Sequence, residues 1–197
     1  MKPAVAWRSA IGLAAALAAA GCSTTHYRPV RDYPIKIGRP YTVRGVTYTP
    51  AAAPDYDQLG YAGWYGNESG NQTASGERFR AKAISGAHTT LPLPSYVEVT
   101  SLDTGRTIVV RVNDRGPFAR GRIIDLSRGA AALLGIRAQG HAAVRVRRVD
   151  PPERDRARLR DGKPAATRPD ASPATLAALR TRLRGPAPDV STAMSSW

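Results

Sequence analysis

The sequence has a single cysteine, Cys22, among 197 residues. An intramolecular disulfide therefore cannot form, and a zinc site built on several cysteine ligands is excluded. Histidine is almost as rare, with three residues. His26 falls in a predicted tether and His141 in a predicted loop, so His88 has no obvious partners for a metal site. We expect the protein to hold neither a metal nor a cofactor.

Acidic residues are scarce relative to basic ones. Asp and Glu total 15 against 29 Lys and Arg, which gives a formal net charge of +14. Such a balance favours polyanionic neighbours: nucleic acid, anionic lipid, or a cell-wall polymer that carries carboxylates or phosphates. The basic residues form no tight block interleaved with aromatic residues, which argues against nucleic acid as the partner.

The apolar run near the start is too short to span a bilayer. Ala10 to Ala20 contains 11 residues without a charge, and the positive residues Lys2 and Arg8 precede it. This order and length are typical of a secretory signal peptide. On these features alone, a plain secretory signal followed by an incidental cysteine is an alternative.

The run ends in "LAAAGC", which resembles a bacterial lipobox. The resemblance implies that residues 1–21 are a lipoprotein signal peptide, cut before Cys22, and that fatty acyl chains such as palmitate on Cys22 anchor the chain in a membrane. Ala19 stands where the lipobox pattern usually has Leu, which is a departure. Ser23 in place of Asp favours, by the same resemblance, the periplasmic face of the outer membrane.

A predicted domain follows a Pro-, Tyr- and Thr-rich tether at residues 22–37. Over residues 38–149 the patterns are short and mostly of strand type. "YTVRGVTYTP" indicates a hairpin around Gly45, and "SYVEVTSLDTGRTIVVRVND" indicates two strands joined by a turn. "DLSRGAAALLGI" indicates a short helix between the N-cap Ser127 and Gly135. We predict a mainly β domain of the size of a small barrel.

The last segment, residues 150–197, is basic and rich in charged residues and Pro, and we predict that it is largely disordered. Within it, residues 173–184 have the pattern of a helix that Ser172 caps and Gly185 ends. This helix has three conceivable settings: on the domain, on an anionic membrane surface, or free in solvent. A marginal solvated helix is the default, because isolated helices of this length are rarely stable.

Separate blocks occur in one order along the domain: "GYAGWYG", "TASGERF", "AISGAHTTLPLPSYVEVTSLDTGRTIVVRVNDRGPF" and "GRIIDLSRGAAALLGI". Together they resemble the rare lipoprotein A family over roughly residues 37–149. The resemblance implies a small six-stranded double-psi β-barrel with one or two short helices. It also implies an endolytic-type lytic transglycosylase, which cuts the MurNAc–GlcNAc β-1,4 bond of peptidoglycan and leaves 1,6-anhydromuramic ends.

Two departures from this family stand out. The family usually carries a Phe-His pair in a "GxxFHGRxT"-like run, and this chain has "GNESGNQT" at residues 66–73. Many members also end in a SPOR domain, which binds denuded glycan at the division septum. The short basic tail leaves no room for one, so we do not expect septal targeting by that route.

By this resemblance, Asp114 in "NDRGPF" is the acid and base of catalysis, assisted by Glu77 in "ASGERF" and His88 in "AHTTLP". A single carboxyl suffices for lytic cleavage because no water enters the products. Each residue also has a structural interpretation. Asp114 suits a turn, because Asn-Asp-x-Gly is ordinary turn composition. Glu77 suits a solvated position beside Arg78, and His88 suits a hydrogen-bonded structural position.

Four further residues are predicted to bind substrate: Trp64, Tyr65, Arg115 and Asp125. Trp64 and Tyr65 are neighbours on an extended segment, so their side chains face opposite sides. One is expected in the core, and the other is free to stack on a sugar ring. Asp125 is a third cleft carboxyl, a buried partner for Arg115 or Arg122, or the cap of the following helix.

Two other function classes stay open at this point. One is a noncatalytic peptidoglycan-binding or wall-remodelling lipoprotein of expansin-like type, which the net positive charge would assist by long-range attraction. The other is an ordinary glycoside hydrolase with two carboxyl groups, which would leave reducing ends. In all of them the expected partner is the glycan strand of peptidoglycan.

Overall fold

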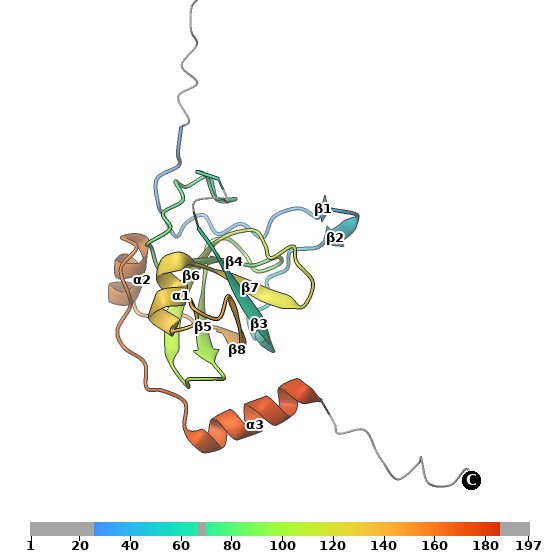
Figure 1. The fold of residues 1–197 in the computed structure, drawn as a ribbon. Coiled ribbons are helices and arrows are strands. Elements are labelled where there is room, and N and C mark those ends of the chain that lie inside the picture. Colours follow the sequence, from blue (N-terminus) through green and yellow to red (C-terminus); the bar gives the residue numbers. More distant parts are fainter. Residues whose placement is uncertain (1–25, 67–69, 186–197) are drawn as a thin grey trace, which may run out of the picture.

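The computed structural model describes residues 26–66 and 70–185, and its centre is a closed six-stranded β-barrel (Figure 1). The predicted signal peptide, Cys22 and residues 67–69 of the altered run lie outside the described residues. The mainly β fold class is confirmed. Around the barrel, the strands are β3 (Asp57–Tyr65), β7 (Arg122–Ser127), β4 (Ser85–Ala87), β6 (Thr107–Asp114), β5 (Ser95–Ser101) and β8 (His141–Arg148).

The barrel is a mixed sheet. Strands β3 and β7 pair in parallel, as do β4 and β6, while the other neighbours pair antiparallel. Across the β5–β6 pair, Val97 faces Val110 and Ser95 faces Val112. Because side chains alternate along a strand, the residues between these valines point the other way. Arg111 and Asn113 of β6 therefore leave the barrel interior, and both are buried beneath chain segments that flank the barrel.

The short helix α1 (Arg128–Leu134) follows β7 with the caps that the sequence predicts. Ser127 Oγ accepts a hydrogen bond from the backbone N–H of Ala130 at 3.1 Å. Gly135 ends the helix at φ 85°, and its N–H donates to the carbonyls of the last turn. A Cβ on Gly129 would lie 2.2 Å from the carbonyl oxygen of Lys82, so this helix approaches the neighbouring loop as closely as a glycine allows.

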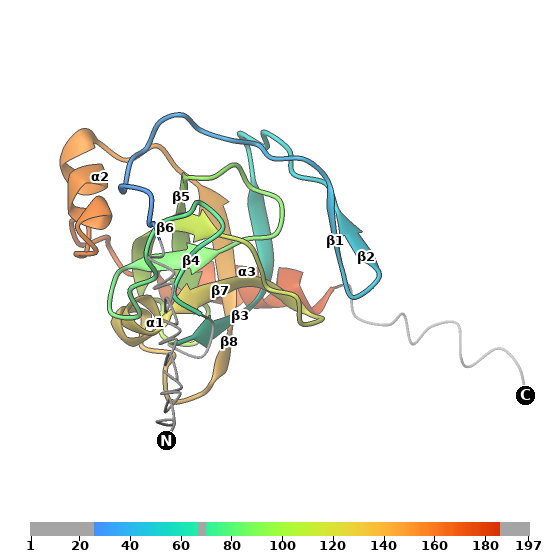
Figure 2. The ribbon, with the colours of Figure 1, turned by 90° about the horizontal axis from the view of Figure 1, so that it is seen from above.

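The predicted hairpin around Gly45 is present as strands β1 (Tyr41–Val43) and β2 (Val46–Tyr48). Arg44 and Gly45 both have positive φ, 51° and 78°, as a two-residue turn of type I′ requires. Figure 2 shows the hairpin standing out from one side of the barrel. Tyr41 and Tyr48 stack on each other and contact the ring of Phe118, which ties the hairpin to the loop after β6.

The segment before this hairpin lies on the barrel, so the tether interpretation is wrong for residues 28–37. The N–H of Arg28 donates to the carbonyl of Gly76 at 2.7 Å. Lys36 and Leu93 exchange two backbone hydrogen bonds, each 2.8 Å long. The sequence suggested a tether because this stretch has no periodic apolar pattern, yet main-chain pairing needs none.

Asp32 is the centre of this docked segment. It is 7% exposed, accepts a hydrogen bond from Tyr96 Oη at 2.7 Å, and forms ion pairs with Arg111 and Arg160. Burial acts to raise the pKa of Asp32, but the hydrogen bonds from Tyr96 and Arg160 and the charge of Arg111 outweigh it, so the pKa lies below its usual value. The carboxylate thus joins the first segment, the barrel and the second helix.

The expected disorder after residue 150 is wrong for residues 150–185. They form α2 (Glu153–Arg160) and α3 (Pro173–Arg184), which lie against different sides of the barrel (Figure 1). The predicted bounds and caps of α3 are confirmed, but the helix is docked on the barrel rather than solvated, because Leu176 and Leu179 are buried. No helix among the described residues is both long enough and apolar enough to cross a membrane.

The composition of the tail misled the disorder prediction because its charged residues have partners. Asp155 is 1% exposed and accepts hydrogen bonds from Ala166 N and Arg168 Nη2. Arg180 donates to the carbonyl of Leu102. Composition counts these side chains as solvated charge, whereas in the fold they satisfy buried backbone and carboxylate groups.

Candidate active site

Asp114 is the last residue of β6 and continues the inward row of Val110 and Val112 to the mouth of the barrel. The strand ends here because Gly116, at φ 140°, and Pro117 follow. Both hydrogen bonds between the described residues and the Asp114 carboxyl end on Oδ1. They come from the backbone N–H groups of Ala74 and Arg115, each at 2.8 Å. This arrangement leaves Oδ2 as the oxygen that can carry and exchange a proton.

The electrostatic setting of Asp114 favours its neutral form. Burial raises the pKa of this carboxyl, and the two amide hydrogen bonds and the Arg115 charge only partly offset it. The net result is a pKa above the usual value for aspartate. A carboxyl in this state is protonated over a wider pH range, as a general acid requires.

A pocket of about 280 Å³ opens beside Asp114 and contains a second carboxyl, Asp125 of β7. Tyr65 also lines this pocket, and its buried hydroxyl has no hydrogen-bond partner in the described part of the chain. Burial, followed by the negative charges of Asp114 and Asp125, raises the pKa of Tyr65 well above its usual value. The phenol beside these two carboxyls is therefore neutral.

Asp125 is held by the same strand from which it projects. Arg122 Nη2 donates to Asp125 Oδ2 at 3.2 Å, and Arg122 Nε lies 3.2 Å from Oδ1 without the alignment of a hydrogen bond. Burial raises the pKa of Asp125 against the charge of Arg122 and the backbone N–H of Gly63. Of the sequence interpretations, the cleft carboxyl and the partner of Arg122 both describe this residue, whereas Ser127 caps the helix.

Glu77 lies outside the Asp114 pocket. Its side chain is buried, not solvated, and both of its oxygens bind Arg111, at 2.7 and 2.8 Å. Asn113 Nδ2 donates to Glu77 Oε2 at 2.7 Å. Glu77 is not among the residues that line the Asp114 pocket. Its catalytic role therefore stays a prediction, and its geometry is that of a structural ion pair.

The position of Glu77 nevertheless bears on Asp114 through the loop of residues 73–77. Thr73 Oγ1 accepts from the N–H of Glu77, and Ser75 donates from both N and Oγ to the carbonyl of Asn113. Between them, Ala74 supplies one of the two N–H donors to Asp114. Glu77 therefore anchors a loop that positions Asp114, which makes it a positioning residue in this structure.

His88 is 2% exposed, and both of its ring nitrogens are hydrogen-bonded. Nδ1 accepts from the N–H groups of Thr90 and Leu91, so the ring proton resides on Nε2 and is donated to Tyr56 Oη at 2.9 Å. Burial, and then the charge of Arg115, lowers the pKa of His88 to about 4. His88 is thus a neutral residue that shapes its loop, which matches the structural interpretation.

The same loop holds Arg115. Arg115 Nη1 donates to the carbonyls of His88 and Leu91, and Nη2 donates to the carbonyl of Ile37 at 2.9 Å. The N–H of His88 in turn donates to the carbonyl of Asp114. Arg115 lines the Asp114 pocket, as its predicted contact with substrate requires. It also ties the docked N-terminal segment to the loop that contains His88 and Leu91.

The side chains of Trp64 and Tyr65 face opposite sides of β3, as expected for neighbours on a strand. Tyr65 stacks on Phe79 with ring centroids 5.0 Å apart and lines the pocket. Trp64 is half-buried and packs against the hydrophobic core. Of the two neighbours, Tyr65 is therefore the one that lines the pocket.

Sequence reasoning missed Phe118 and Gln72 as pocket residues and Asn113 as a partner of Glu77. Asn113 had a visible signal, because it alternates with Val112 and Asp114 and must face the other side of the strand from them. Phe118 follows the Gly-Pro pair directly in "NDRGPF", which places it at the rim of any site built on Asp114.

A family model described as "Lytic transglycolase" matches residues 57–146. This stretch is similar to proteins of the rare lipoprotein A family. Over 114 residues, 57% of this chain, it is 52% identical to an endolytic peptidoglycan transglycosylase RlpA of Pseudomonas aeruginosa strain UCBPP-PA14, of which the match covers 33%. Over 115 residues, again 57% of this chain, it is 47% identical to the protein of the same name from Neisseria meningitidis serogroup A, of which it covers 48%.

The rare lipoprotein A relatives are longer than the stretch they share with this chain, which spans a third to a half of their length. Among solved structures, the Streptomyces papain inhibitor matches 51% of this chain and all of its own, at 24% identity and a TM-score of 0.43. The pocket carboxyls Asp114 and Asp125 and the barrel strands, except for the last two residues of β8, fall within the residues 57–146 that the family model matches.

Proposed function

We propose that this protein is a lytic transglycosylase of endolytic type, which cleaves the β-1,4 bond between MurNAc and GlcNAc in peptidoglycan. The observation that carries the proposal is Asp114, a carboxyl with a raised pKa in an open pocket at the mouth of the barrel. The naming of its relatives as endolytic peptidoglycan transglycosylases supports the same reaction.

In the first step, Asp114 Oδ2 donates its proton to the glycosidic oxygen while the bond from that oxygen to the muramyl anomeric carbon breaks. Positive charge develops on the muramyl ring. In the second step, the Asp114 carboxylate accepts the proton of the muramyl 6-hydroxyl, whose oxygen bonds to the anomeric carbon. The products are a free GlcNAc end and a 1,6-anhydromuramic end. Asp114 recovers its proton, and no water is consumed.

Asp125 and Tyr65 have supporting roles in this reaction. A guanidinium contacts Asp125, whereas the hydrogen-bond donors to Asp114 are backbone amides, so Asp114 is the carboxyl that carries the proton and Asp125 is ionised. The ionised Asp125 then stabilises the positive charge of the transition state. The buried Tyr65 hydroxyl, without a hydrogen-bond partner in the described residues, is a neutral polar group beside the two carboxyls.

The presence of two carboxyls in one pocket also favours a second candidate, a glycoside hydrolase of the two-carboxyl type. In that case Asp125 would activate a water molecule or attack the sugar itself. The two reactions differ in whether an oxygen atom from water enters the product.

The test is digestion of purified sacculi in ¹⁸O-labelled water, followed by mass spectrometry of the released strands. Lytic cleavage predicts 1,6-anhydromuramic ends without label. Labelled reducing ends would establish hydrolysis and overturn the proposal. If no strands are released while the protein still binds sacculi, the function is that of a noncatalytic wall-binding module.

We also propose that acyl chains on Cys22 anchor the protein at the periplasmic face of the outer membrane. The support is the sequence alone: a short apolar run after two positive residues, ending at the single cysteine. Metabolic labelling with a palmitate analogue should mark the wild-type protein and leave the Cys22→Ser variant unmarked. Labelling of the variant would exclude Cys22 as the acylated residue.

A further inference from the structure

A second pocket, of about 440 Å³, lies against the docked N-terminal segment and is lined by four cationic side chains: Arg28, Arg31, Lys36 and Arg115. The acidic residue that reaches it is Glu77, and both oxygens of Glu77 are taken by Arg111. The charge presented to a ligand in this pocket is therefore strongly positive. We call it the basic pocket.

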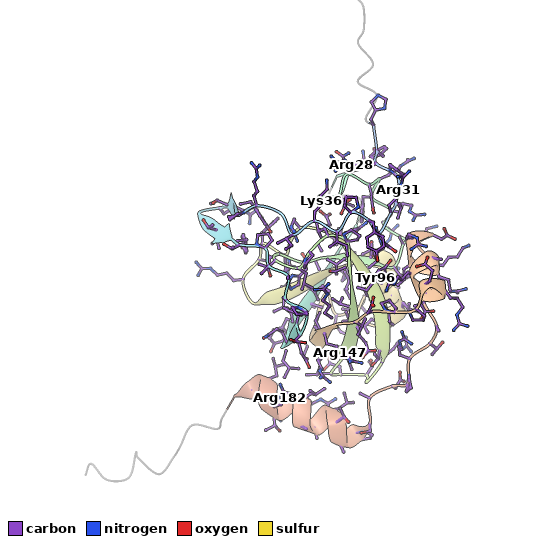
Figure 3. The ribbon with its side chains drawn as sticks, turned by 180° about the vertical axis from the view of Figure 1, so that it is seen from behind. Arg28, Arg31, Lys36, Tyr96, Arg147 and Arg182 are labelled. Carbon is purple, nitrogen blue, oxygen red and sulfur yellow. The ribbon has the colours of Figure 1, made fainter. Side chains whose placement is uncertain are left out.

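The first three cations of the basic pocket are exposed and form no ion pair within the described residues. Figure 3 shows Arg28, Arg31 and Lys36 gathered at one end of the molecule, far from Arg182 of α3. Some other arginines have carboxylate partners, as the pairs Arg145–Asp57 and Arg147–Glu98 show. Arg28, Arg31 and Lys36 differ from the other unpaired cations in that they line one pocket together.

The backbone beneath these cations is fixed. Arg28 N donates to the carbonyl of Gly76, Lys36 pairs with Leu93, and Asp32 between them is buried in its ion pairs. The cations therefore stand on a segment that is already ordered, and a ligand does not have to order that backbone on binding.

The basic pocket adjoins the Asp114 pocket. Arg115 lines both pockets. Ala74 lines the basic pocket and at the same time donates its N–H to Asp114 Oδ1 at 2.8 Å. A polymer whose reacting bond lies at Asp114 would therefore extend directly past Ala74 and Arg115 toward the three free cations.

We propose that the basic pocket is a carboxylate-binding subsite for the strand that is cut at Asp114. This inference rests on the proposed function, because it takes the ligand to be a peptidoglycan glycan strand. Each muramyl unit bears a lactyl ether that ends in a carboxyl carbon. In a denuded strand this group is a free carboxylate, and in a peptide-bearing strand the carboxylates belong to the stem peptide. Guanidinium and ammonium groups recognise either source by charge-assisted hydrogen bonds.

The experiment measures binding by the full Asp114→Asn chain, so that no ligand is cleaved. The ligands are soluble denuded strands, peptide-bearing strands, and denuded strands whose carboxyls have been converted to methylamides. A triple variant carries Arg28→Gln, Arg31→Gln and Lys36→Gln in addition. A control triple carries Arg137→Gln, Arg182→Gln and Arg184→Gln, exposed residues outside both pockets, and loses the same charge.

The expected result is about a tenfold loss of affinity for carboxylate-bearing strands in the pocket triple, with a small loss in the control triple. The methylamide strands should bind weakly to all variants. Loss confined to denuded strands identifies the lactyl carboxylate as the source, and loss confined to peptide-bearing strands identifies the stem peptide. Either outcome supports the subsite.

Equal losses in the two triples would overturn the proposal in favour of long-range attraction by net charge. Tight binding of the methylamide strands would also overturn it. Failure of the proposed function shows separately, because it appears as absent or hydrolytic cleavage by the wild-type protein. In that case, carboxylate-dependent binding in the pocket would still be detected with the Asp114→Asn chain.

Discussion

At the scale of single residues, the site depends on how differently two aspartates are surrounded. Asp114 receives hydrogen bonds from neutral amides, whereas Asp125 contacts the guanidinium of Arg122. Burial raises the pKa of both carboxyls. The guanidinium beside Asp125 favours the ionised form of that carboxyl, which leaves Asp114 as the residue that gives the proton and takes it back.

The pH dependence of cleavage should report the raised pKa of Asp114. The acid must be protonated, so the rate should fall as the pH rises through a pKa above the ordinary value of about 3.9. A rate that keeps rising from acid to alkaline pH would contradict this role.

The stability of the Asp114→Asn variant tests the same raised pKa, and the difference in stability from wild type should change with pH in the opposite direction to the rate. Because ionisation is disfavoured in the folded state, the variant should gain free energy of unfolding relative to wild type as the pH rises through the same window.

Glu77→Gln should destabilise the fold strongly, because it leaves Arg111 buried without its bidentate partner. Breaking a buried ion pair by removing one partner costs about 3–5 kcal/mol. The free energy of unfolding can be measured by urea denaturation, with Asp57→Asn as the control. Asp57 pairs with Arg145 near the surface, where such pairs contribute about 1 kcal/mol or less. Equal losses in the two variants would contradict the structural role of Glu77.

At the scale of elements, the outside of the barrel is covered by segments that come from both ends of the described chain. The docked N-terminal segment lies over β5 and β6, and α2 meets it through the ion pair between Arg160 and Asp32. Arg80 donates to the carbonyls of Arg160 and Asp161, which fixes the end of α2 to the loop before β4. The position of the basic pocket therefore depends on both flanks.

Asp32→Asn should loosen the N-terminal segment and α2 together. The change removes the charge that pairs with Arg111 and Arg160, so amide hydrogen exchange should accelerate in residues 28–36 and in α2. Asp150→Asn is the control, because Asp150 is exposed and pairs with Arg156 on the surface. Unchanged amide exchange in α2 would contradict the proposed role of Asp32 in holding the N-terminal segment and α2 together. Because the pKa of Asp32 is lowered, the stabilisation it gives should persist above about pH 4 and disappear as the pH falls through the lowered pKa.

Gly129→Ala should lower the melting temperature although alanine favours helices. In an exposed helix interior, replacing glycine by alanine stabilises by about 1 kcal/mol. Here the added Cβ would lie 2.2 Å from the carbonyl oxygen of Lys82, so α1 or the neighbouring loop must move. Ala132→Gly, at an exposed position of the same helix, is the reverse control and should cost about 1 kcal/mol. A higher melting temperature for Gly129→Ala would show that the contact relaxes freely.

At the scale of the whole molecule, the features that depend on a few neighbouring residues could be predicted from the sequence. The alternating valines of β5 and β6 and the caps Ser127, Gly135 and Ser172 are local signals, and the structure has them all. Asp114 was visible because its motif ends a clear strand. These predictions needed no knowledge of which distant residues meet.

Partners far apart along the chain were not predictable. Asp32 stands in a Pro-rich stretch, and its partners Tyr96, Arg111 and Arg160 lie 64, 79 and 128 residues away. Composition alone therefore predicts a tether before the barrel and disorder after it. For the same reason Glu77 was grouped with Asp114 rather than with Arg111, 34 residues away. Alternation along β6 places Arg111 and Asp114 on opposite faces, but only the fold shows that Glu77 meets the face of Arg111.

The most direct test of the central claim is the release of strands from sacculi by the wild-type protein and by Asp114→Asn, at equal concentration of folded protein. The asparagine oxygen can still accept the two backbone hydrogen bonds, so the variant should fold, but its amide supplies no acid. We predict 1,6-anhydromuramic products from the wild type and a loss of at least about a hundredfold in the variant. Comparable release of anhydro products by the folded variant would contradict the assignment of Asp114 as the acid and base.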